Sequence, residues 1–254
     1  GLDGINIVIG TKDRSKVVEI VERYKAEEGV LNAVTDIKGE KEFEPLKVSN
    51  LKDRTRAYIK IQEGCNRYCT YCIIPYARGP IRSRKPEDVI EEVKTLAENG
   101  FKEVVLAGIH IASYGLDLGN ITLADIIEKV HSVDGIERIR FSSMEPKAVD
   151  DEFVARMAKL PKVCDHYHLS LQSGSDATLK AMNRRYTAQE YADACQRLRD
   201  TFPNVAITTD IIVGFPTETE ENFNESYDFA KKVKLSKIHV FPYSPKTGTP
   251  AAKI

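Results

Sequence analysis

The chain has 254 residues, of which 42% are hydrophobic and 30% are charged, a balance that is ordinary for a globular protein with a full apolar core. The formal net charge is −1, so the total charge excludes a strongly basic nucleic-acid-binding protein but leaves room for a local basic patch. The sequence shows no signal peptide and no apolar run of membrane-spanning length, so we expect a cytoplasmic protein without membrane contact.

The first fifty residues differ in pattern from the rest. Residues 5–9 are mostly apolar, as in a short strand, and residues 15–28 place apolar side chains on one helical face. Residues 32–49 are charged and lack a helical stripe, which is typical of a linker with weak strand content. We therefore place a domain boundary near residue 50, between units at 1–50 and 51–254.

From residue 57 onward, predicted strands and helices alternate. The strands are expected at 57–62, 103–109, 137–142, 166–171, 205–213 and 237–242. The helices are expected at 86–99, 122–131, 150–159, 175–182, 187–201 and 218–233. Pro86 and Gly100 fit the start and the end of one helix. Thr217 with Glu220 fits a capping box at the start of another.

Six consecutive β-then-α units predict an α/β fold, a parallel sheet with helices outside, either doubly wound or barrel-like. No glycine-rich dinucleotide-binding loop follows the first strand of this series, which counts against a Rossmann domain. A cluster of cysteines follows it instead. In a barrel, the chemistry sits on the loops after the C-terminal ends of the strands, which is where these cysteines fall.

Three of the five cysteines, Cys65, Cys69 and Cys72, crowd into eight residues with the spacing C-x3-C-x2-C. This is a poor disulfide framework and a good pattern of metal ligands. A [4Fe–4S] cluster needs four ligands, so three thiolates on one loop leave one iron open. The amino and carboxylate groups of S-adenosylmethionine (SAM) suit that iron, and an electron from the cluster then cleaves SAM to a 5′-deoxyadenosyl radical.

The alternatives are a zinc site and a cluster that only transfers electrons, either of which suits a non-catalytic docking module. A structural zinc ion needs a fourth protein ligand, and neither Cys164 nor His110 has a fitting spacing. Cys164 and Cys195 are expected to be buried as small apolar residues. All five histidines lack metal-ligand spacing and are expected to be structural: His110, His131, His166, His168 and His239.

Several stretches, in this order, resemble the radical SAM methylthiotransferases, and the resemblance covers about residues 55–254. They are 61–79 (IQEGCNRYCTYCIIPYARG), 106–115 (LAGIHIASYG), 168–176 (HLSLQSGSD) with 182–187 (MNRRYT), and 210–220 (DIIVGFPTETE). The resemblance implies a partial (β/α)6 TIM-like barrel, a [4Fe–4S] cluster, SAM, and an electron donor such as flavodoxin or ferredoxin. It is far more specific than the cysteine spacing alone.

Within this family, residues 75–79 and 108–115 look most like the bacterial branch that modifies threonylcarbamoyladenosine. The implied reaction adds a methylthio group to C2 of N6-threonylcarbamoyladenosine next to the anticodon of a tRNA. The alternatives are the branches that modify isopentenyladenosine in tRNA or an aspartate of a ribosomal protein.

Two departures from the family pattern bear on the domains. The family's N-terminal domain holds a second [4Fe–4S] cluster with three cysteines of its own, and residues 1–50 contain none. They look like only the last strand and helix of that domain plus a linker. The family also ends in a TRAM RNA-binding domain, whereas this chain stops at Ile254. We therefore expect a radical SAM core fragment that cleaves SAM without completing methylthiolation.

The resemblance and the expected strand ends together point to residues that contact SAM. Glycines at strand ends let the backbone approach the cofactor, and polar side chains that face into a barrel suit its ribose and amino-acid end. Arg184 and Arg185 offer guanidinium groups for the SAM carboxylate. The predicted contacts are Tyr71, Gly108, Ser143, Glu145, Ser170, Gln172, Arg185 and Gly214. Packing, turn formation or a solvated surface are the alternative roles.

A local basic stretch follows the cysteine loop and consists of Arg78, Arg82, Arg84 and Lys85. We predict that it contacts RNA phosphates near the active site. A solvated charged face is the alternative.

Overall fold

The computed structural model describes residues 4–26, 29–44, 46 and 55–254. The domain boundary predicted near residue 50 lies outside the described residues. Within them, no helix has both the length and the apolar character needed to cross a bilayer.

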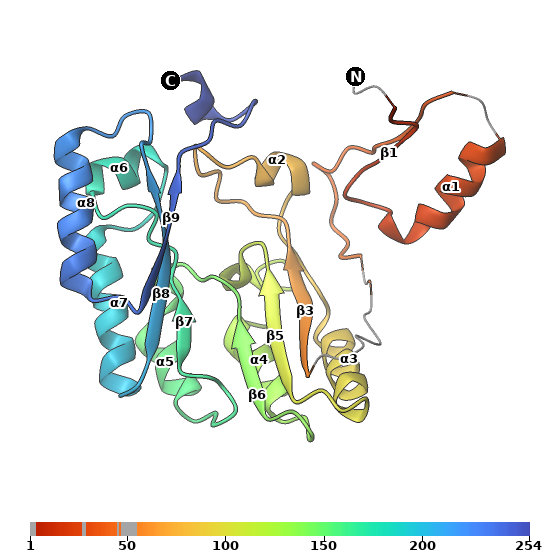
Figure 1. Cartoon of the computed structure of the whole chain (residues 1–254). Coiled ribbons are helices and arrows are strands. Elements are labelled where there is room, and N and C mark those ends of the chain that lie inside the picture. Colours follow the sequence, from red (N-terminus) through yellow and green to blue (C-terminus); the bar gives the residue numbers. More distant parts are fainter. Residues whose placement is uncertain (1–3, 27–28, 45, 47–54) are drawn as a thin grey trace.

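The N-terminal part of the chain forms a small unit of its own to one side of the main body (Figure 1). It contains β1 (Ile7–Ile9), η1 (Arg14–Lys16), α1 (Val17–Ala26) and β2 (Leu31–Ala33). Strands β1 and β2 pair in parallel, and α1 connects them. The strand and the helix predicted here are confirmed, and the weak strand content expected after residue 31 takes the form of β2.

The main body is a curved half-barrel of parallel strands (Figure 1). Its strands are β3 (Arg56–Glu63), β5 (Glu103–Gly108), β6 (Arg138–Phe141), β7 (His166–His168), β8 (Ala206–Val213) and β9 (Lys237–Pro242). The short strand β4 (Arg82–Ser83) pairs antiparallel with β3 at the edge. The parallel strands lie side by side in the order of the sequence, without a switch point, so the barrel-like alternative is confirmed over the doubly wound one.

Two sheets make up this half-barrel, and backbone contacts join them. One holds β3, β5 and β6, and the other holds β7, β8 and β9. The Met144 amide donates to the His168 carbonyl at 2.9 Å, and the Ser170 amide donates to the Met144 carbonyl at 2.9 Å. The predicted strand 166–171 is therefore interrupted: β7 ends at His168, and the chain beyond it continues the sheet through isolated bridges.

Helices cover the outer face of the sheets (Figure 1). They are α3 (Pro86–Glu98), α4 (Leu123–His131), α5 (Asp151–Met157), α6 (Asp176–Ala181), α7 (Ala188–Thr201) and α8 (Glu220–Val233). The turns η2 (Ile111–Ser113), η3 (Pro146–Ala148) and η4 (Pro250–Lys253) and the short helix α2 (Ile74–Arg78) lie in the connections. The six predicted helices are confirmed to within a few residues, whereas α2 was not predicted.

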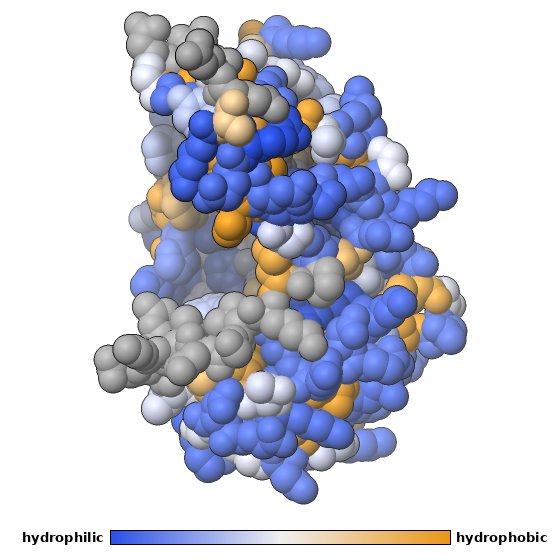
Figure 2. Space-filling view, turned by 90° about the vertical axis from the view of Figure 1, so that its right-hand side faces the viewer, coloured by the Kyte–Doolittle hydropathy of each residue, from blue (hydrophilic) through white to orange (hydrophobic). Residues whose placement is uncertain are grey.

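The period-two alternation of the strands separates an apolar outer face from a polar inner one. On β8, Ile207, Thr209 and Ile211 are buried beneath the helices. Between them, Thr208 and Asp210 face the hollow of the half-barrel and are only partly buried. The apolar core thus lies between sheet and helices, and the concave face keeps its polar groups available. The outer surface of the molecule on the N-terminal side is also largely hydrophilic, with apolar residues in scattered groups (Figure 2).

The start of α8 corrects one sequence prediction. Thr217 and Glu220 do not form the capping box; Thr219 caps the helix, with Asn222 as the reciprocal partner. The Asn222 amide donates to Thr219 Oγ1 at 3.3 Å, and the Thr219 amide donates to Asn222 Oδ1 at 3.3 Å. Asparagine closes the box in place of the usual Glu or Gln, which is why the sequence pattern pointed two residues too early.

We predict that Thr219→Ala lowers the free energy of unfolding by about 1 kcal/mol, because the Asn222 amide in the first turn of α8 loses its acceptor, Thr219 Oγ1. Thr217→Ala, two residues earlier and also exposed, is the matched control and should change it by less than about 0.5 kcal/mol. Urea unfolding followed by circular dichroism measures both. An equal effect of the two substitutions would contradict this cap assignment.

Candidate functional site

The cysteine loop leaves the C-terminal end of β3 through a glycine that no other residue can replace. Gly64 has a φ of +72°, and a Cβ atom there would lie 1.7 Å from the Pro80 carbonyl oxygen. The Cys65 amide donates to the Gly79 carbonyl at 3.1 Å. The two ends of the loop are thereby closed on each other, so the cysteines are held on a compact, fixed turn.

The middle of the loop is anchored to the end of α6. The Thr70 amide donates to the Met182 carbonyl at 3.1 Å, and Thr70 Oγ1 donates to the Ala181 carbonyl at 2.9 Å. Asn183, with a φ of +57°, donates from its side-chain amide to the Tyr68 carbonyl at 2.9 Å. The fold therefore holds the cysteine loop, at the end of β3, against the segment that follows β7.

The three thiols are free and lie near one another. Cys69 is buried, whereas Cys65 and Cys72 are partly exposed. Burial raises the pKa of Cys65, and the neighbouring thiols of Cys69 and Cys72 raise it further. The Arg67 amide donates to Cys65 Sγ at 3.4 Å, and Arg184 Nη1 donates to Cys69 Sγ at 3.3 Å. The Arg67 amide opposes this rise in the pKa of Cys65, and a metal requires the thiolate form.

This donor set fits an iron–sulfur cluster better than a single ion. In the part of the chain that the structure describes, no three His, Cys, Asp or Glu side chains converge as ligands of one metal ion do. A cubane cluster does not need such convergence, because each thiolate binds a different iron. A loop that presents three separate thiols on one turn meets that requirement.

A buried carboxylate lies beside the thiols and collects basic groups from three loops. Glu145, which follows β6, is 5% exposed. Its Oε2 lies 2.8 Å from Nη2 of Arg67, within the cysteine loop, and its Oε1 lies 3.4 Å from Nη2 of Arg184. His110 Nε2, after β5, lies 3.3 Å from Oε2. Burial alone would raise the pKa of Glu145, but the partners outweigh it and the pKa is lowered.

The cluster of Glu145 and Arg184 offers the two charges that bind a free amino acid. A buried guanidinium pairs well with a carboxylate, and a buried carboxylate pairs with an ammonium group. Both side chains lie next to Cys69 or to the loop that carries it. An amino-acid end placed here would lie against the thiols of the cysteine loop.

The predicted cofactor glycine Gly108 ends β5, and its surroundings give it a packing role as well. A Cβ atom at Gly108 would lie 2.9 Å from Gln62 Oε1. Gln62 ties the strand ends together: its Nε2 donates to the Gly64 carbonyl at 2.8 Å. The Gly108 amide donates to Ser142 Oγ at 3.2 Å, whereas Ser143, the predicted serine, is exposed.

The structure places Arg184, and not the predicted Arg185, in the site. The turn at Asn183 directs Arg184 inward, where it is partly buried, and leaves Arg185 exposed. The predicted Ser170 joins the same cluster through its backbone. The Ser170 carbonyl accepts from Tyr186 Oη at 2.5 Å and from Arg184 Nη2 at 3.5 Å.

The remaining predicted SAM contacts lie around the same end of the barrel. Gln172 is buried with a φ of +71°, and its backbone bridges to β8. Tyr71 packs against the buried side chains of Met182 and Phe215, and this burial raises its pKa. Gly214 is exposed with a φ of +70°, and no heavy atom lies within 4 Å of the position of a Cβ there.

The predicted RNA-contacting stretch is wrong for two of its members. Arg82 is 3% exposed and Arg84 is 2% exposed, so neither presents its charge to solvent. Arg82 Nη2 lies 3.8 Å from Glu63 Oε2, and Arg84 forms a short ion pair with Glu92. These arginines neutralise two buried carboxylates, Glu63 directly before the cysteine loop and Glu92 on α3, which a sequence pattern of charges does not reveal.

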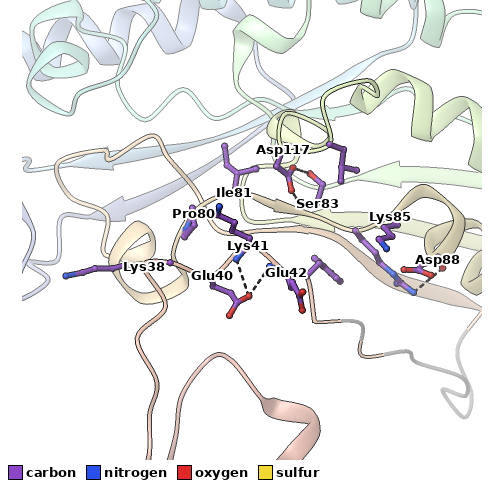
Figure 3. Close-up of a pocket in the computed structure, with 14 residues that line it drawn as sticks. Lys38, Glu40, Lys41, Glu42, Pro80, Ile81, Ser83, Lys85, Asp88 and Asp117 are labelled. Atoms are coloured by element: carbon purple, nitrogen blue, oxygen red, sulfur yellow. Dashed lines mark hydrogen bonds between the residues drawn. The ribbon is translucent and has the colours of Figure 1, made fainter.

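The other two members of the stretch differ in setting. Arg78 is partly exposed and pairs with Glu63 at 3.2 Å. Lys85 is exposed and lines a cleft of about 760 Å³ between segment 38–43 and segment 80–88 (Figure 3). Of the four residues, Lys85 alone is classed as exposed, as the predicted contact with RNA phosphates requires.

Sequence reasoning missed Arg67, His110 and Ser142 as members of the site. His110 was expected to be structural because it has no metal-ligand spacing, yet it lies against Glu145. Arg67 stands between two of the cysteines, and His110 stands in the stretch after β5. Their position within the stretches that resemble the family could have identified them as site residues, whereas their residue type alone could not.

Comparisons with known proteins agree with this geometry. Residues 59–230 match the family described as the Radical SAM superfamily. The chain is 45% identical over its whole length to threonylcarbamoyladenosine tRNA methylthiotransferase MtaB of Bacillus subtilis, of which it covers 56%. It is 46% identical over 98% of its length to a tRNA-2-methylthio-N(6)-dimethylallyladenosine synthase of a Thermoanaerobacter species, of which it covers 53%. The chain thus spans about half the length of these relatives.

A solved structure shows the same fold at low sequence identity. The radical S-adenosylmethionine methyltransferase TsrM from Kitasatospora setae superposes with a TM-score of 0.64 and 16% identity. The match covers 77% of this chain and 36% of that one. This likeness supports the half-barrel architecture alone.

We predict that Glu145→Gln lowers the free energy of unfolding by about 3 kcal/mol at neutral pH, because buried Arg184 and its neighbours lose their counter-charge. Glu137→Gln, an exposed carboxylate, is the control and should cost less than about 1 kcal/mol. Guanidinium unfolding at several pH values measures the difference between each variant and the unsubstituted chain.

The pH dependence of this difference has a defined sign. The lowered pKa of Glu145 stabilises the fold above the ordinary carboxyl range, and this contribution is lost as the pH falls through the lowered pKa. The cost of Glu145→Gln should therefore shrink in acid. A cost that is constant with pH would show that packing, and not charge, accounts for it.

Proposed function

Because the chain belongs to the radical SAM superfamily, whose members use a [4Fe–4S] cluster and SAM, we propose that Cys65, Cys69 and Cys72 hold the cluster. The observation that carries this proposal is the turn after β3, which presents three thiols and no fourth cysteine. Three protein ligands leave one iron for SAM. When bound there, the cluster supplies the electron that cleaves the C–S bond of SAM.

The residues around the thiols fit the amino-acid end of SAM. The Arg184 guanidinium suits the SAM carboxylate, and the Glu145 carboxylate together with the backbone at Gly108 suits the ammonium group. The apolar packing of Tyr71 and the open backbone at Gly214 support their proposed contact with the adenine ring. Ser170 and Gln172 remain candidates for the ribose. The chain's own contribution is to position SAM and to shield it from water.

For the whole enzyme, we propose that a methylthio group is added to C2 of N6-threonylcarbamoyladenosine in tRNA. Support comes from residues 75–79 and 108–115, which resemble that branch, and from the 45% identity to the Bacillus subtilis enzyme over the full chain. The 46% identity to a dimethylallyladenosine synthase keeps that nucleoside as the alternative. A flavodoxin or ferredoxin is the proposed electron donor, and the cytoplasm is the proposed location.

The N-terminal unit is proposed to be the end of a preceding domain that docks on the cysteine loop. Thr11 Oγ1 donates to the Ala77 carbonyl at 3.0 Å. Arg14 Nη2 donates at 3.3 Å to Glu63, which directly precedes Gly64 in that loop. These contacts of Thr11 and Arg14 support the proposal that a sulfur-donating domain docks beside the site.

We predict that the chain, reconstituted with iron and sulfide without oxygen, cleaves SAM to 5′-deoxyadenosine when dithionite is added. Cys69→Ala should lower the rate at least about 100-fold, because the cluster loses one of its ligands. Cys164→Ala, a partly buried cysteine outside the loop, is the matched control and should keep the rate. Liquid chromatography with mass spectrometry quantifies the product, and full activity of Cys69→Ala would exclude the proposed ligand set.

We also predict a change in tRNA when the gene is deleted in its host. The methylthio form of threonylcarbamoyladenosine should disappear and its unmethylthiolated precursor should accumulate. Mass spectrometry of digested tRNA measures both nucleosides. Persistence of that form, with loss of the methylthio form of the dimethylallyl nucleoside, would establish the alternative substrate.

A further inference from the structure

A row of polar side chains crosses the inner face of the second sheet. In the parallel register of β7 and β8, His166 lies opposite Ala206 and His168 lies opposite Thr208. In the pairing of β8 with β9, Asp210 lies opposite His239. His168 is 16% exposed at its side chain and Asp210 is 29% exposed, so both are accessible from the hollow. The predicted SAM contacts include none of these residues.

The hydrogen bonds in this row have only one consistent direction for neutral histidines. His168 Nε2 lies 3.1 Å from Asp210 Oδ2, and a carboxylate only accepts, so Nε2 carries the proton. His168 Nδ1 must then accept from Thr208 Oγ1, which lies 3.0 Å away. Thr208 in turn accepts from His166 Nε2 at 3.2 Å. The row is thus a fixed chain of donors that ends at Asp210.

The end of this chain leaves an acceptor facing the hollow. Among the described residues, Asp210 Oδ1 has no hydrogen-bond donor, whereas Oδ2 is taken by His168. Burial and the charge of Arg140 lower the pKa of His166, which keeps its end of the row neutral. Lys237 and His239 on β9 are exposed at the rim of the same face. A ligand that offers a neutral donor matches the free oxygen of Asp210.

The row lies a short way along the chain from a residue that contacts the partner of a thiol. Ser170, whose carbonyl accepts from Arg184, is two residues beyond His168, or about 7 Å along an extended chain. Arg184 itself contacts Cys69 Sγ at 3.3 Å. If one atom of a substrate lies against a cofactor on the cysteine loop, the ring or sugar of that substrate would therefore reach His168 and Asp210.

We propose that the His168–Asp210 pair is a binding site for the target nucleoside itself. The inference rests on the proposed tRNA function, in which a base must leave its stack and enter the barrel to present C2. An adenosine offers neutral donors, the N6–H and the ribose 2′-hydroxyl, that Asp210 accepts. The carboxylate side chain of a substrate aspartate offers Asp210 no hydrogen-bond donor. The pair thus fits the donor groups of a nucleoside better than an aspartyl side chain.

The test uses the protein at its natural full length and two anticodon stem–loop RNAs. One carries N6-threonylcarbamoyladenosine at the target position, and the other is abasic there. Fluorescence anisotropy gives Kd for both. The unsubstituted protein should bind the first RNA at least about tenfold more tightly than the abasic one. Asp210→Asn and His168→Gln should each remove most of that preference, while their Kd for the abasic RNA stays within about twofold.

Asp165→Asn is the matched control, because Asp165 is exposed and precedes β7 at the opposite end of the sheet. It should leave both Kd values unchanged. Variants that keep the nucleoside preference, or that lose affinity for both RNAs equally, would overturn the proposal. So would preferential binding of an aspartate-containing peptide. Methylthiolation of the RNA by the unsubstituted protein tests the proposed function separately. If methylthiolation occurs, the proposed function stands even when the binding results overturn the role of the His168–Asp210 pair. If it does not occur, the proposed function fails whatever the binding results are.

Discussion

The carboxylate of Glu145 is the point at which separate segments of the chain meet. It draws Arg67 from the cysteine loop, His110 from the segment after β5, and Arg184 from the segment after α6. A buried charge is tolerated only when it is paired, so each of these loops is held in place by the need to satisfy the same group. The same contacts hold the thiols in place, because the Arg67 amide donates to the sulfur of Cys65 and the Arg184 guanidinium donates to the sulfur of Cys69.

The half-barrel adds a second group of polar side chains, on its inner face, to the ion pairs around Glu145. Alternation along β7 and β8 buries Tyr167 and Thr209 beneath the helices and leaves His168 and Asp210 on the inner face. The apolar outer face supplies the folding free energy, so the inner face is free to carry polar groups. The basic and acidic groups around the thiols suit a cofactor, and the proposed role of His168 and Asp210 on the inner face is to bind a substrate.

Much of the fold followed from the sequence because its signals were local. Pro86 and Gly100 marked a helix correctly, and apolar runs such as 103–109 located the parallel strands. The site was only partly predictable. The spacing of the cysteines identified the loop. Arg184 and Arg185 are neighbours of the same residue type, so the sequence could not show which of them the turn at Asn183 directs into the site.

Burial and side-chain hydrogen bonds explain the other differences between the predictions and the structure. Arg82 and Arg84 looked like a surface patch because a sequence shows charge without showing depth. Thr217 in place of Thr219 was chosen as the cap because the reciprocal partner is an asparagine. His110 and His168 were expected to be structural because histidine spacing was tested only against metal ligation; in the structure each lies against a carboxylate that is far away in the sequence.

The central claim is that the cysteine loop leaves one iron for the amino-acid end of SAM. Electron–nuclear double resonance on the reduced, reconstituted chain tests it directly, with SAM labelled with ¹⁵N at its amino group or ¹⁷O at its carboxylate. The account predicts that both labels couple strongly to the cluster, and that Cys69→Ala abolishes the coupling. A cluster that forms normally, carries a fourth protein ligand and shows no coupling to either label would contradict it.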